Sequence, residues 1–333
     1  MAELVLAIGS SHAPTLNSAA AEIPMHGEID KGTEHWKRSL TDKDGAPTTY
    51  DALLANADAG IAAQVAPDIL TNRVARCTSG ITRLAATIAE AELDALIVVG
   101  DDQHEQFRND NMPAILVYWG ETIRNNVLQL GDDAPEFWQR ARSQFHEPAE
   151  ARDYPVAAGL GRHLIEHLIE AEFDIGQATE LGRPHGEGHA FGFVHRRLMP
   201  KSVVPILPIM LNTYFPPNQP RPRRCYTLGQ AIAKAVRGWE GDGRVGILAS
   251  GGLSHFVVDE ELDTSVLDAC RNNQSDVLSS IPMNKLNSGS SEIRNWIVTA
   301  GAAEHLDTRW QDYVPCYRTP AGTGTGIAFA EWL

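Results

Sequence analysis

The sequence predicts an α/β fold: one domain with a mostly parallel central sheet flanked by helices. Three apolar runs carry this prediction, Leu4–Ile8, Ala95–Val99 and Val245–Ala249. Each run is continuous rather than alternating, which is typical of a strand buried on both faces. Residues 68–92, between the first two runs, repeat apolar side chains at three- and four-residue steps, as an amphipathic helix does. We found no internal repeat, low-complexity segment or linker that would divide the chain.

Each of the three runs ends in small or polar residues, and a histidine follows: His12, His104 and His255. A single histidine after a strand usually hydrogen-bonds to loop backbone. The carboxyl ends of strands in an open α/β sheet, however, are where such proteins bind their ligands. Three histidines at one edge of one sheet therefore predict a shared site.

The remaining segments follow in chain order. Residues 17–66 show little apolar periodicity, so we expect a long excursion with a few short helices, forming a lid or a subunit contact. The patterns predict strands at 112–119, 173–181 and 203–211 and helices at 136–145, 156–171, 226–238, 259–271 and 292–305. Two prolines in 203–211 place that strand at an edge or a bulge. The glycine-rich Thr319–Gly326 lacks the lysine and the spacing of a phosphate-binding loop.

Composition restricts the function classes. The chain has 333 residues, 43% hydrophobic and 21% charged, as in an ordinary soluble protein. A net charge of −15 disfavours nucleic-acid partners, because no basic face offsets phosphate repulsion. Four scattered cysteines without a CxxC pattern indicate reduced thiols and a cytoplasmic location. The N-terminus lacks the pattern of a signal sequence, and no apolar stretch reaches the roughly 18 residues of a membrane span.

The histidines suggest metal chemistry. Two neutral imidazoles and one carboxylate, with the remaining positions open, suit a non-haem Fe²⁺ that reacts with O2. His12, His104 and one of the acids after His255 would supply this set from three strand ends. The same acids, at the start of a predicted helix capped by Asp259, also suit compensation of the helix dipole. Spacing alone does not decide between these two interpretations.

Several motifs together resemble the class III extradiol ring-cleavage dioxygenases, such as the protocatechuate 4,5-dioxygenase β subunit and the gallate-type enzymes. They are Ser11-His12-Ala13-Pro14, Asp102-Gln103-His104 with Phe107, Gly188-His189-Ala190, Gly251-Gly252 with Ser254-His255, and Glu261-Leu262-Asp263. The resemblance implies an α/β fold and one Fe²⁺. By motif position it implies that His12, His104 and Glu261 are the metal ligands. It also implies that His189 is the acid–base histidine and that His255 is a second catalytic histidine near the metal.

The same resemblance implies a substrate and an assembly. The substrate would be an aromatic diol like protocatechuate, gallate or 3-O-methylgallate, opened by O2 to a semialdehyde or dicarboxylic acid. Arg108, Arg196 or Arg197 would receive a ring carboxylate. We expect a homo-oligomer, such as a homodimer, in which residues 17–66 take the place of the small helical partner subunit; that partner is not excluded. Two motifs depart from the family: its usual Asn-Asp-His is Asp102-Gln103-His104 here, and its Asp-His-Gly is Gly188-His189-Ala190.

Two alternatives stay open. Tetrahedral His/His/Glu sites also suit Zn²⁺, so a zinc-dependent hydrolase or decarboxylase could use the same pocket. A non-enzymatic binding protein could also keep this fold without turnover. The presence of His12, His104, Glu261 and His189 argues against that second alternative.

Overall fold

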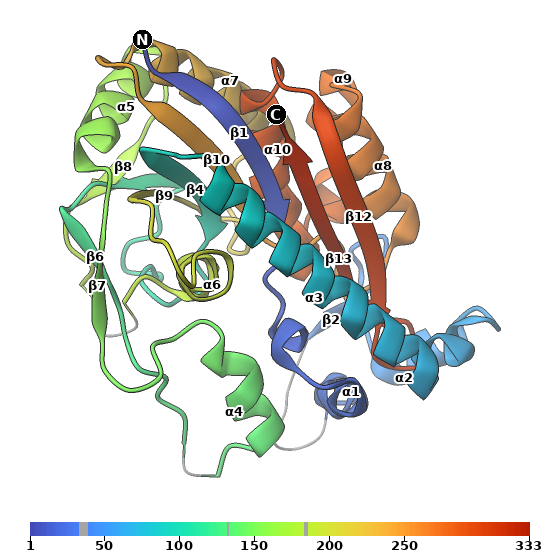
Figure 1. Cartoon of the computed structure of the whole chain (residues 1–333). Helices are drawn as coiled ribbons and strands as arrows, with labels where there is room; N and C mark the ends of the chain where they lie inside the picture. The colour runs from blue at the N-terminus through green and yellow to red at the C-terminus, as the bar shows by residue number, and fades with distance from the viewer. Residues whose placement is uncertain (33–38, 132, 183–185) are drawn as a thin grey trace.

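The computed structural model describes residues 1–32, 39–131, 133–182 and 186–333 and has the α/β fold that the sequence predicts. Within these residues, a nine-stranded mixed sheet forms the centre in the order β11-β13-β1-β10-β4-β9-β5-β8, with β12 paired to β13 (Figure 1). The strands are β1 (Glu3–Ser10), β4 (Ala95–Asp101), β5 (Ile115–Tyr118), β8 (Gly176–Ala178), β9 (Ile206–Leu211), β10 (Arg244–Ser250), β11 (His255–Val257), β12 (Thr308–Tyr317) and β13 (Thr323–Trp332). The central pairs β1–β10, β10–β4 and β4–β9 are parallel.

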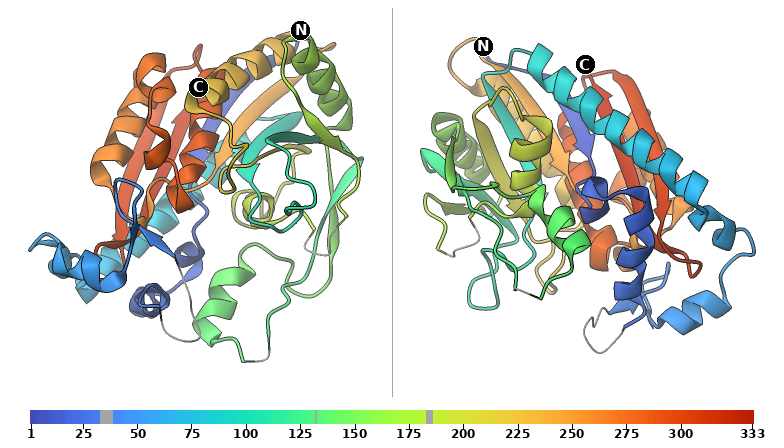
Figure 2. Two further views of the ribbon diagram at one scale, coloured as in Figure 1. Left: turned by 180° about the vertical axis from the view of Figure 1, so that it is seen from behind. Right: turned by 60° about the horizontal axis from the view of Figure 1, so that its bottom comes forward.

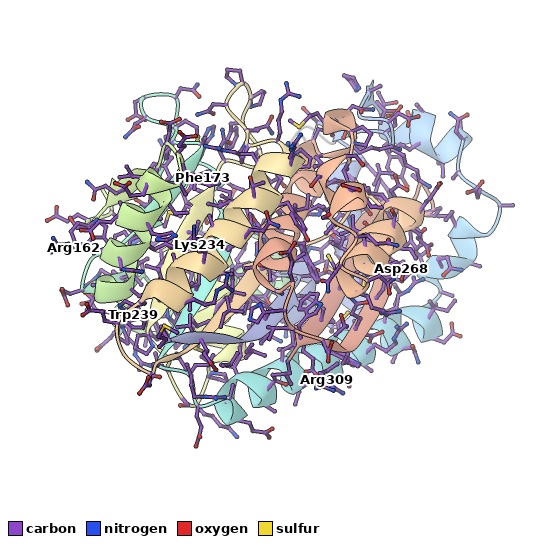
Figure 3. The ribbon with its side chains drawn as sticks, turned by 90° about the horizontal axis from the view of Figure 1, so that it is seen from above. Arg162, Phe173, Lys234, Trp239, Asp268 and Arg309 are labelled. Carbon is purple, nitrogen blue, oxygen red and sulfur yellow. The ribbon has the colours of Figure 1, made fainter. Side chains whose placement is uncertain are left out.

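The central strand β4 is buried on both faces, which explains its continuous apolar run. Ile97 and Val99 pack into one core cluster with α5 (Ala158–Glu170), α7 (Pro222–Gly238) and α10 (Ile293–Ala302). Leu96 and Val98 point to the opposite cluster, with α3 (Pro67–Glu90) and α6 (His189–Phe193). Figure 3 shows α5, α7 and α8 (Glu260–Arg271), marked by Arg162, Lys234 and Asp268, together on one face.

Shorter elements connect these layers. They are the helices α1 (Ile23–Asp30), α2 (Tyr50–Ala55), α4 (Glu136–Ser143) and α9 (Ser275–Ser279), the single-turn helices η1 (Pro14–Asn17), η2 (Ala20–Glu22), η3 (Ile61–Val65), η4 (Val194–Leu198), η5 (Met283–Lys285) and η6 (Ser288–Glu292), and the two-stranded pairs β2 (Leu40–Thr41) with β3 (Pro47–Thr48) and β6 (Thr122–Asn125) with β7 (Arg152–Pro155). Among the helices that the structure describes, none has both the length and the apolar character needed to cross a bilayer.

The prediction that residues 203–211 form an edge strand or a bulge is wrong. β9 lies between β4 and β5. The carbonyl of Ile206 accepts from Ala157 on the side away from β4, and residues two apart in a strand point the same way. Pro208 therefore turns its nitrogen away from β4. β9 pairs with β5 only from Ile209 onward, so the missing N–H of Pro208 costs the sheet no hydrogen bond.

The C-terminal hairpin of β12 and β13 is absent from the sequence prediction. β13 is buried along its whole length and joins β1, β11 and β12. Its glycines allow close approach: a Cβ at Gly324 would collide with the carbonyl of Cys316, and one at Gly326 with the carboxylate of Asp263. The glycine-rich end of the chain is thus a tightly packed strand.

Residues 17–66 contain short helices, as the sequence predicts, and the small β2–β3 pair, which it does not predict; residues 33–38 lie outside the described residues. α1 and α4 lie side by side beyond the carboxyl ends of the parallel strands (Figure 2). Arg318 joins α1 to the body of the protein through a buried ion pair with Asp30, with Nε 2.5 Å from Oδ2.

Candidate metal centre

A cavity of 240 Å³ lies at the carboxyl ends of β1, β4 and β10. Its walls come from segments far apart in the chain. The lining residues are His12, Ala13, Pro14, Thr15, His26, Ile29, Gln103, Trp138, Arg142, His189, Tyr214, Gly252, His255, Phe256, Glu292, Arg318 and Thr325. α1 and α4 both contribute to this lining, so the cavity is covered on the side opposite the sheet.

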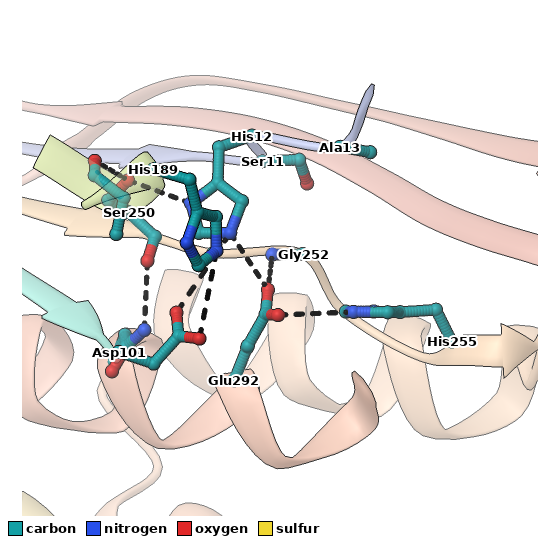
Figure 4. A network of polar contacts seen from close by, with 12 residues as sticks. Ser11, His12, Ala13, Asp101, His189, Ser250, Gly252, His255 and Glu292 are labelled. Atoms are coloured by element: carbon teal, nitrogen blue, oxygen red, sulfur yellow. Dashed lines mark hydrogen bonds and ion pairs between the residues drawn. The ribbon is translucent and has the colours of Figure 1, made fainter. Parts of the chain in front are cut away.

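Four buried side chains at the edge of this cavity could hold a metal ion: His12, Asp101, His189 and Glu292 (Figure 4). One ligand atom from each lies within 4.8 Å of all the others. His12 Nε2 is 3.4 Å from Glu292 Oε2 and 3.9 Å from Asp101 Oδ1. Two imidazoles and two carboxylates at this spacing form a donor set suited to a divalent transition metal.

His12 is held in the tautomer that a metal ligand requires. The hydroxyl of Ser250 donates to the carbonyl of Ala190 at 2.6 Å, so its oxygen is left to accept from His12 Nδ1–H at 3.0 Å. The proton on Nδ1 leaves Nε2 with its lone pair facing the carboxylates. Within the described residues, this buried Nε2 has no hydrogen-bond partner. A second hydrogen bond that fixes ring and tautomer is the usual support of a metal-bound histidine.

His189 opens α6 and is fixed by Glu105. One carboxylate oxygen of Glu105 accepts the backbone N–H of His189 at 3.0 Å, and the other accepts Nδ1–H at 2.8 Å. Nε2 therefore faces the centre, 3.9 Å from Asp101 Oδ2. Burial lowers the pKa of His189, but the Glu105 carboxylate outweighs it and raises the pKa to about 9. The same pair lowers the pKa of Glu105 to about 2 against the effect of burial.

The end of β10 and the start of α10 position Glu292. Trp296 and Asn295 donate to the carbonyls of Gly251 and Ser250, each at 2.8 Å. Glu292 lies on the same helical face, because positions i, i+3 and i+4 are neighbours. Its Oε2 accepts the N–H of Gly252 at 2.7 Å. These contacts anchor the carboxylate beside His12.

His255 lies on the other side of Glu292. Its Nδ1–H donates to the carbonyl of Leu253 at 2.9 Å, and Nε2 is 3.2 Å from Glu292 Oε1. Burial lowers the pKa of His255, but the Glu292 carboxylate outweighs it, so the pKa is raised. Burial raises the pKa of Glu292, but the charge of His255 outweighs it and holds this pKa well below its usual range. Glu292 is therefore an anion in the site.

Asp101, the last residue of β4, supplies the second carboxylate. Burial raises its pKa to about 6 and the nearby Glu292 charge adds to this, while His189 and His12 oppose it. Its Oδ1 is buried and has no hydrogen-bond partner among the described residues. An unpartnered carboxylate oxygen and an unpartnered imidazole nitrogen thus face each other, an arrangement that a cation would satisfy.

The structure brings His12, His189 and His255 to this cavity but does not bring His104 or Glu261. The His104 ring stacks on Phe215, with centroids 3.6 Å apart, and its Nε2 is not within the four-donor group. Glu261 is exposed in the first turn of α8, beside Lys285 and Asp259 at a separate surface hollow. It faces solvent because Asp259 and Asp263 occupy the buried positions of that turn.

Sequence reasoning missed Asp101 and Glu292. Asp101 ends a predicted strand and directly precedes the Asp102-Gln103-His104 motif. Its position was therefore a usable signal. Glu292 lies at the start of a predicted helix that is far from the other motifs in sequence. One sequence feature could have indicated it. Glu292, Asn295 and Trp296 stand at i, i+3 and i+4, so a helix places their polar groups on one face of an otherwise apolar segment.

One arginine of the cavity lining, Arg142, has no ion pair among the residues that the structure describes. Arg142 of α4 lies over the Phe145 ring and forms no salt bridge within the described part of the chain. Burial lowers its pKa from a very high value, and the Glu105 charge opposes this, so the guanidinium stays charged. Arg318 also lines the cavity but is paired with Asp30. The arginines that the sequence suggested lie elsewhere: Arg108 is exposed, Arg196 pairs with Glu147, and Arg197 bonds to Gln144 and Asn17.

Fold and site together define a class: an α/β protein with a buried two-imidazole, two-carboxylate group at the carboxyl edge of its sheet. A family model described as the catalytic LigB subunit of aromatic ring-opening dioxygenase matches residues 70–328, and the chain belongs to this family.

Two curated relatives agree with this assignment. Gallate dioxygenase of Pseudomonas putida is 28% identical over 202 residues, 56% of this chain and 57% of that protein. The 2,3-dihydroxyphenylpropionate/2,3-dihydroxicinnamic acid 1,2-dioxygenase of Comamonas testosteroni is 26% identical over 175 residues, 53% of this chain and 47% of that protein. The chain thus spans about half the length of the curated relatives it matches.

Proposed function

We propose that this protein is an Fe²⁺-dependent extradiol dioxygenase that opens the ring of an aromatic diol with O2. The observation that carries the proposal is the buried donor group beside a covered cavity. His12 Nε2 and Asp101 Oδ1, both buried and unpartnered within the described residues, fit a divalent cation. Membership of the ring-opening family supports the reaction class.

We assign the metal ligands to His12, Asp101 and Glu292, in place of the set His12, His104 and Glu261 that the motifs suggested. The three come from the ends of β1 and β4 and the start of α10. Bound Fe²⁺ would supply positions for both diol oxygens and for O2, and a path for electrons between them. The protein's own side chains then do the remaining work of orientation and proton transfer.

We assign proton transfer to His189. Glu105 accepts the hydrogen bond from Nδ1–H, so Nε2 is the atom that faces the cavity and exchanges protons with the substrate. The raised pKa of about 9 means that Nε2 carries a proton near neutral pH. A carboxylate behind an imidazole both orients the ring and stabilises its protonated form. His255, which donates through Nδ1 to Leu253, keeps Nε2 on the cavity side and is the second proton-transfer group.

We propose that the substrate carries a carboxylate, which Arg142 receives. A charged guanidinium without a carboxylate partner in the described residues is suited to a planar anion. The two curated relatives are named for gallate and for dihydroxyphenylpropionate, which are both carboxylates. The guanidinium of Arg142 would offer a positive charge to a substrate of this kind.

We also propose that residues 17–66 cover the site, so that a homo-oligomer of this chain suffices. His26 and Ile29 of α1 already line the cavity. An inactive purified chain that gains activity only when a second polypeptide is added would contradict this.

The reaction is tested with anaerobically reconstituted protein. Fe²⁺-loaded protein is expected to consume one O2 per ring opened when given gallate, protocatechuate or dihydroxyphenylpropionate, followed by an oxygen electrode and loss of ring absorbance. Protein loaded with Zn²⁺ is the control and should consume no O2. Zinc-dependent hydrolysis or decarboxylation without O2 uptake would instead support the hydrolase alternative. Binding of these acids without any turnover would support a binding protein.

A further inference from the structure

Gln103 contacts three of the four candidate metal donors. Its amide Nε2 is 3.2 Å from Glu292 Oε1, 3.3 Å from Asp101 Oδ2 and 3.4 Å from His189 Nε2. The two carboxylates can only accept hydrogen bonds while ionised. The two carboxylate contacts therefore require the NH2 end of the amide, which also lies beside His189 Nε2.

An amide NH2 in this place does what a cation does. It offers positive hydrogens to two buried carboxylates, although it carries no net charge, so it neutralises them only in part. The amide nitrogen lies within 3.4 Å of atoms of Asp101, Glu292 and His189, so the amide competes with a metal ion for the same two carboxylates.

Gln103 is also able to leave. The four donors are buried, whereas Gln103 is exposed and lines the cavity. The backbone beneath it is held separately, because Asp102 accepts the N–H groups of Gln106 at 2.7 Å and Phe107 at 3.1 Å. The side chain can therefore turn toward the cavity without disturbing the strand end or the loop.

We propose that Gln103 is an internal competitor of the metal: its amide binds Asp101 and Glu292 in the metal-free protein and is displaced when a cation enters. The amide therefore lowers the affinity of the site for the metal ion. In the metal-free protein it reduces the repulsion between the Asp101 and Glu292 carboxylates. The inference rests on the metal site of the proposed function but not on ring cleavage.

The test is titration of metal-stripped, full-length protein with Co²⁺, followed by calorimetry and by the visible absorption of the bound ion. Gln103→Ala is expected to bind Co²⁺ about tenfold more tightly than wild type, the equivalent of one hydrogen bond to a charged group. Metal-free Gln103→Ala should also melt at a lower temperature than metal-free wild type. Asn109→Ala, at an exposed position of the same loop, is the matched control and should change neither quantity.

Three other outcomes of the titration would overturn the inference. Weaker Co²⁺ binding by Gln103→Ala would make the side chain a ligand through its carbonyl oxygen. Equal affinity would make it a bystander. Absence of Co²⁺ binding in both proteins would remove the metal site and with it the proposed function. Normal metal binding without O2 uptake by the iron form would contradict the proposed function alone.

Discussion

At the scale of single residues, the hydrogen bonds decide which atoms are available for chemistry. Ser250 and Glu105 accept hydrogen bonds from Nδ1–H of His12 and His189 respectively, and so turn both Nε2 atoms toward the same centre. The two rings pack edge to face with centroids 4.6 Å apart. Neither partner is visible as a motif, since Ser250 ends a strand and Glu105 follows His104 in a loop.

His12→Ala should abolish metal retention while leaving the fold in place. The substitution removes an imidazole whose Nε2 has no other partner in the described residues, so little structural hydrogen bonding is lost. Metal content by mass spectrometry and the far-ultraviolet spectrum measure both properties. His167→Ala, on α5 and outside the cavity lining, is the matched control and should retain the metal. Full metal occupancy in the His12 variant would exclude His12 as a ligand.

Glu105→Gln should change the pH dependence of stability in metal-free protein. The folded pKa of His189 is raised from 6.5 to about 9, so its contribution is complete below pH 6.5 and is lost as pH rises through 9. The folded pKa of Glu105 is lowered from 4.5 to about 2, so its contribution is present above pH 4.5 and lost as pH falls. The two windows overlap between pH 4.5 and 6.5.

Urea unfolding of wild type and Glu105→Gln across this range measures the effect. The difference in free energy of unfolding should be largest between pH 4.5 and 6.5 and should shrink toward pH 9. A difference that stays constant from pH 5 to pH 9 would show that the two side chains do not form an ion pair.

At the scale of elements, a buried carboxylate ties α8 to the strand ends that form the site. Asp263 accepts from the N–H of Ser254 and from its hydroxyl, each at 2.7 Å, and from the hydroxyl of Tyr313 at 2.8 Å. These bonds join α8, the turn before β11, and β12. They also explain why the Glu261-Leu262-Asp263 motif matters structurally although Glu261 faces solvent.

Asp263→Ala should destabilise the protein by about 3 kcal/mol, because it leaves buried donors without an acceptor. Asp268→Ala on the same helix is the control. Asp268 is exposed, and among the described residues its ion pair is with Arg271 at 3.8 Å, so its removal should change stability by less than about 0.5 kcal/mol. Equal effects of the two substitutions in chemical denaturation would contradict this assignment.

The sequence predicts the three central strands and most helices because burial on two faces and helical periodicity are local patterns. It fails where long-range packing decides. The glycines of β13 are typical of a loop. The strand requires glycine at positions 324 and 326 because Cys316 and Asp263 pack too closely for a side chain there. In the site, His12, His189 and His255 are predictable from strand ends and motifs. Asp101 ends a predicted strand and was open to the same reasoning. Glu292 was not, because only the tertiary arrangement of α10 against β10 brings it to His12.

At the scale of the whole molecule, the cavity joins the sheet edge to α1 and α4, which lie beyond the carboxyl ends of the parallel strands (Figures 1 and 2). The metal donors come from the sheet side and Arg142 comes from the covering side. A substrate bound between them would present its diol to the donors and its acid to the cover. In the proposed function, recognition of the acid and cleavage of the ring would thus take place on opposite sides of the cavity.

Arg142→Gln should raise KM for carboxylate-bearing diols by about 10- to 100-fold, the value of one to two charge-assisted hydrogen bonds. KM for unsubstituted catechol should stay within a few-fold of wild type, since catechol has no acid to bind. Arg140→Gln, an exposed position on the same helix, is the control. An equal loss for catechol and for the acids would show that Arg142 supports the fold of the cover instead.

We propose that Glu292, and not Glu261, supplies the carboxylate of the metal centre beside His12 and Asp101. Iron content and O2 uptake of anaerobically reconstituted Glu292→Ala and Glu261→Ala test this assignment most directly. Glu261→Ala, altered on an exposed surface, should keep stoichiometric iron and wild-type O2 uptake with a carboxylated diol. Glu292→Ala should lose both. Iron retained by Glu292→Ala and lost by Glu261→Ala would contradict the account.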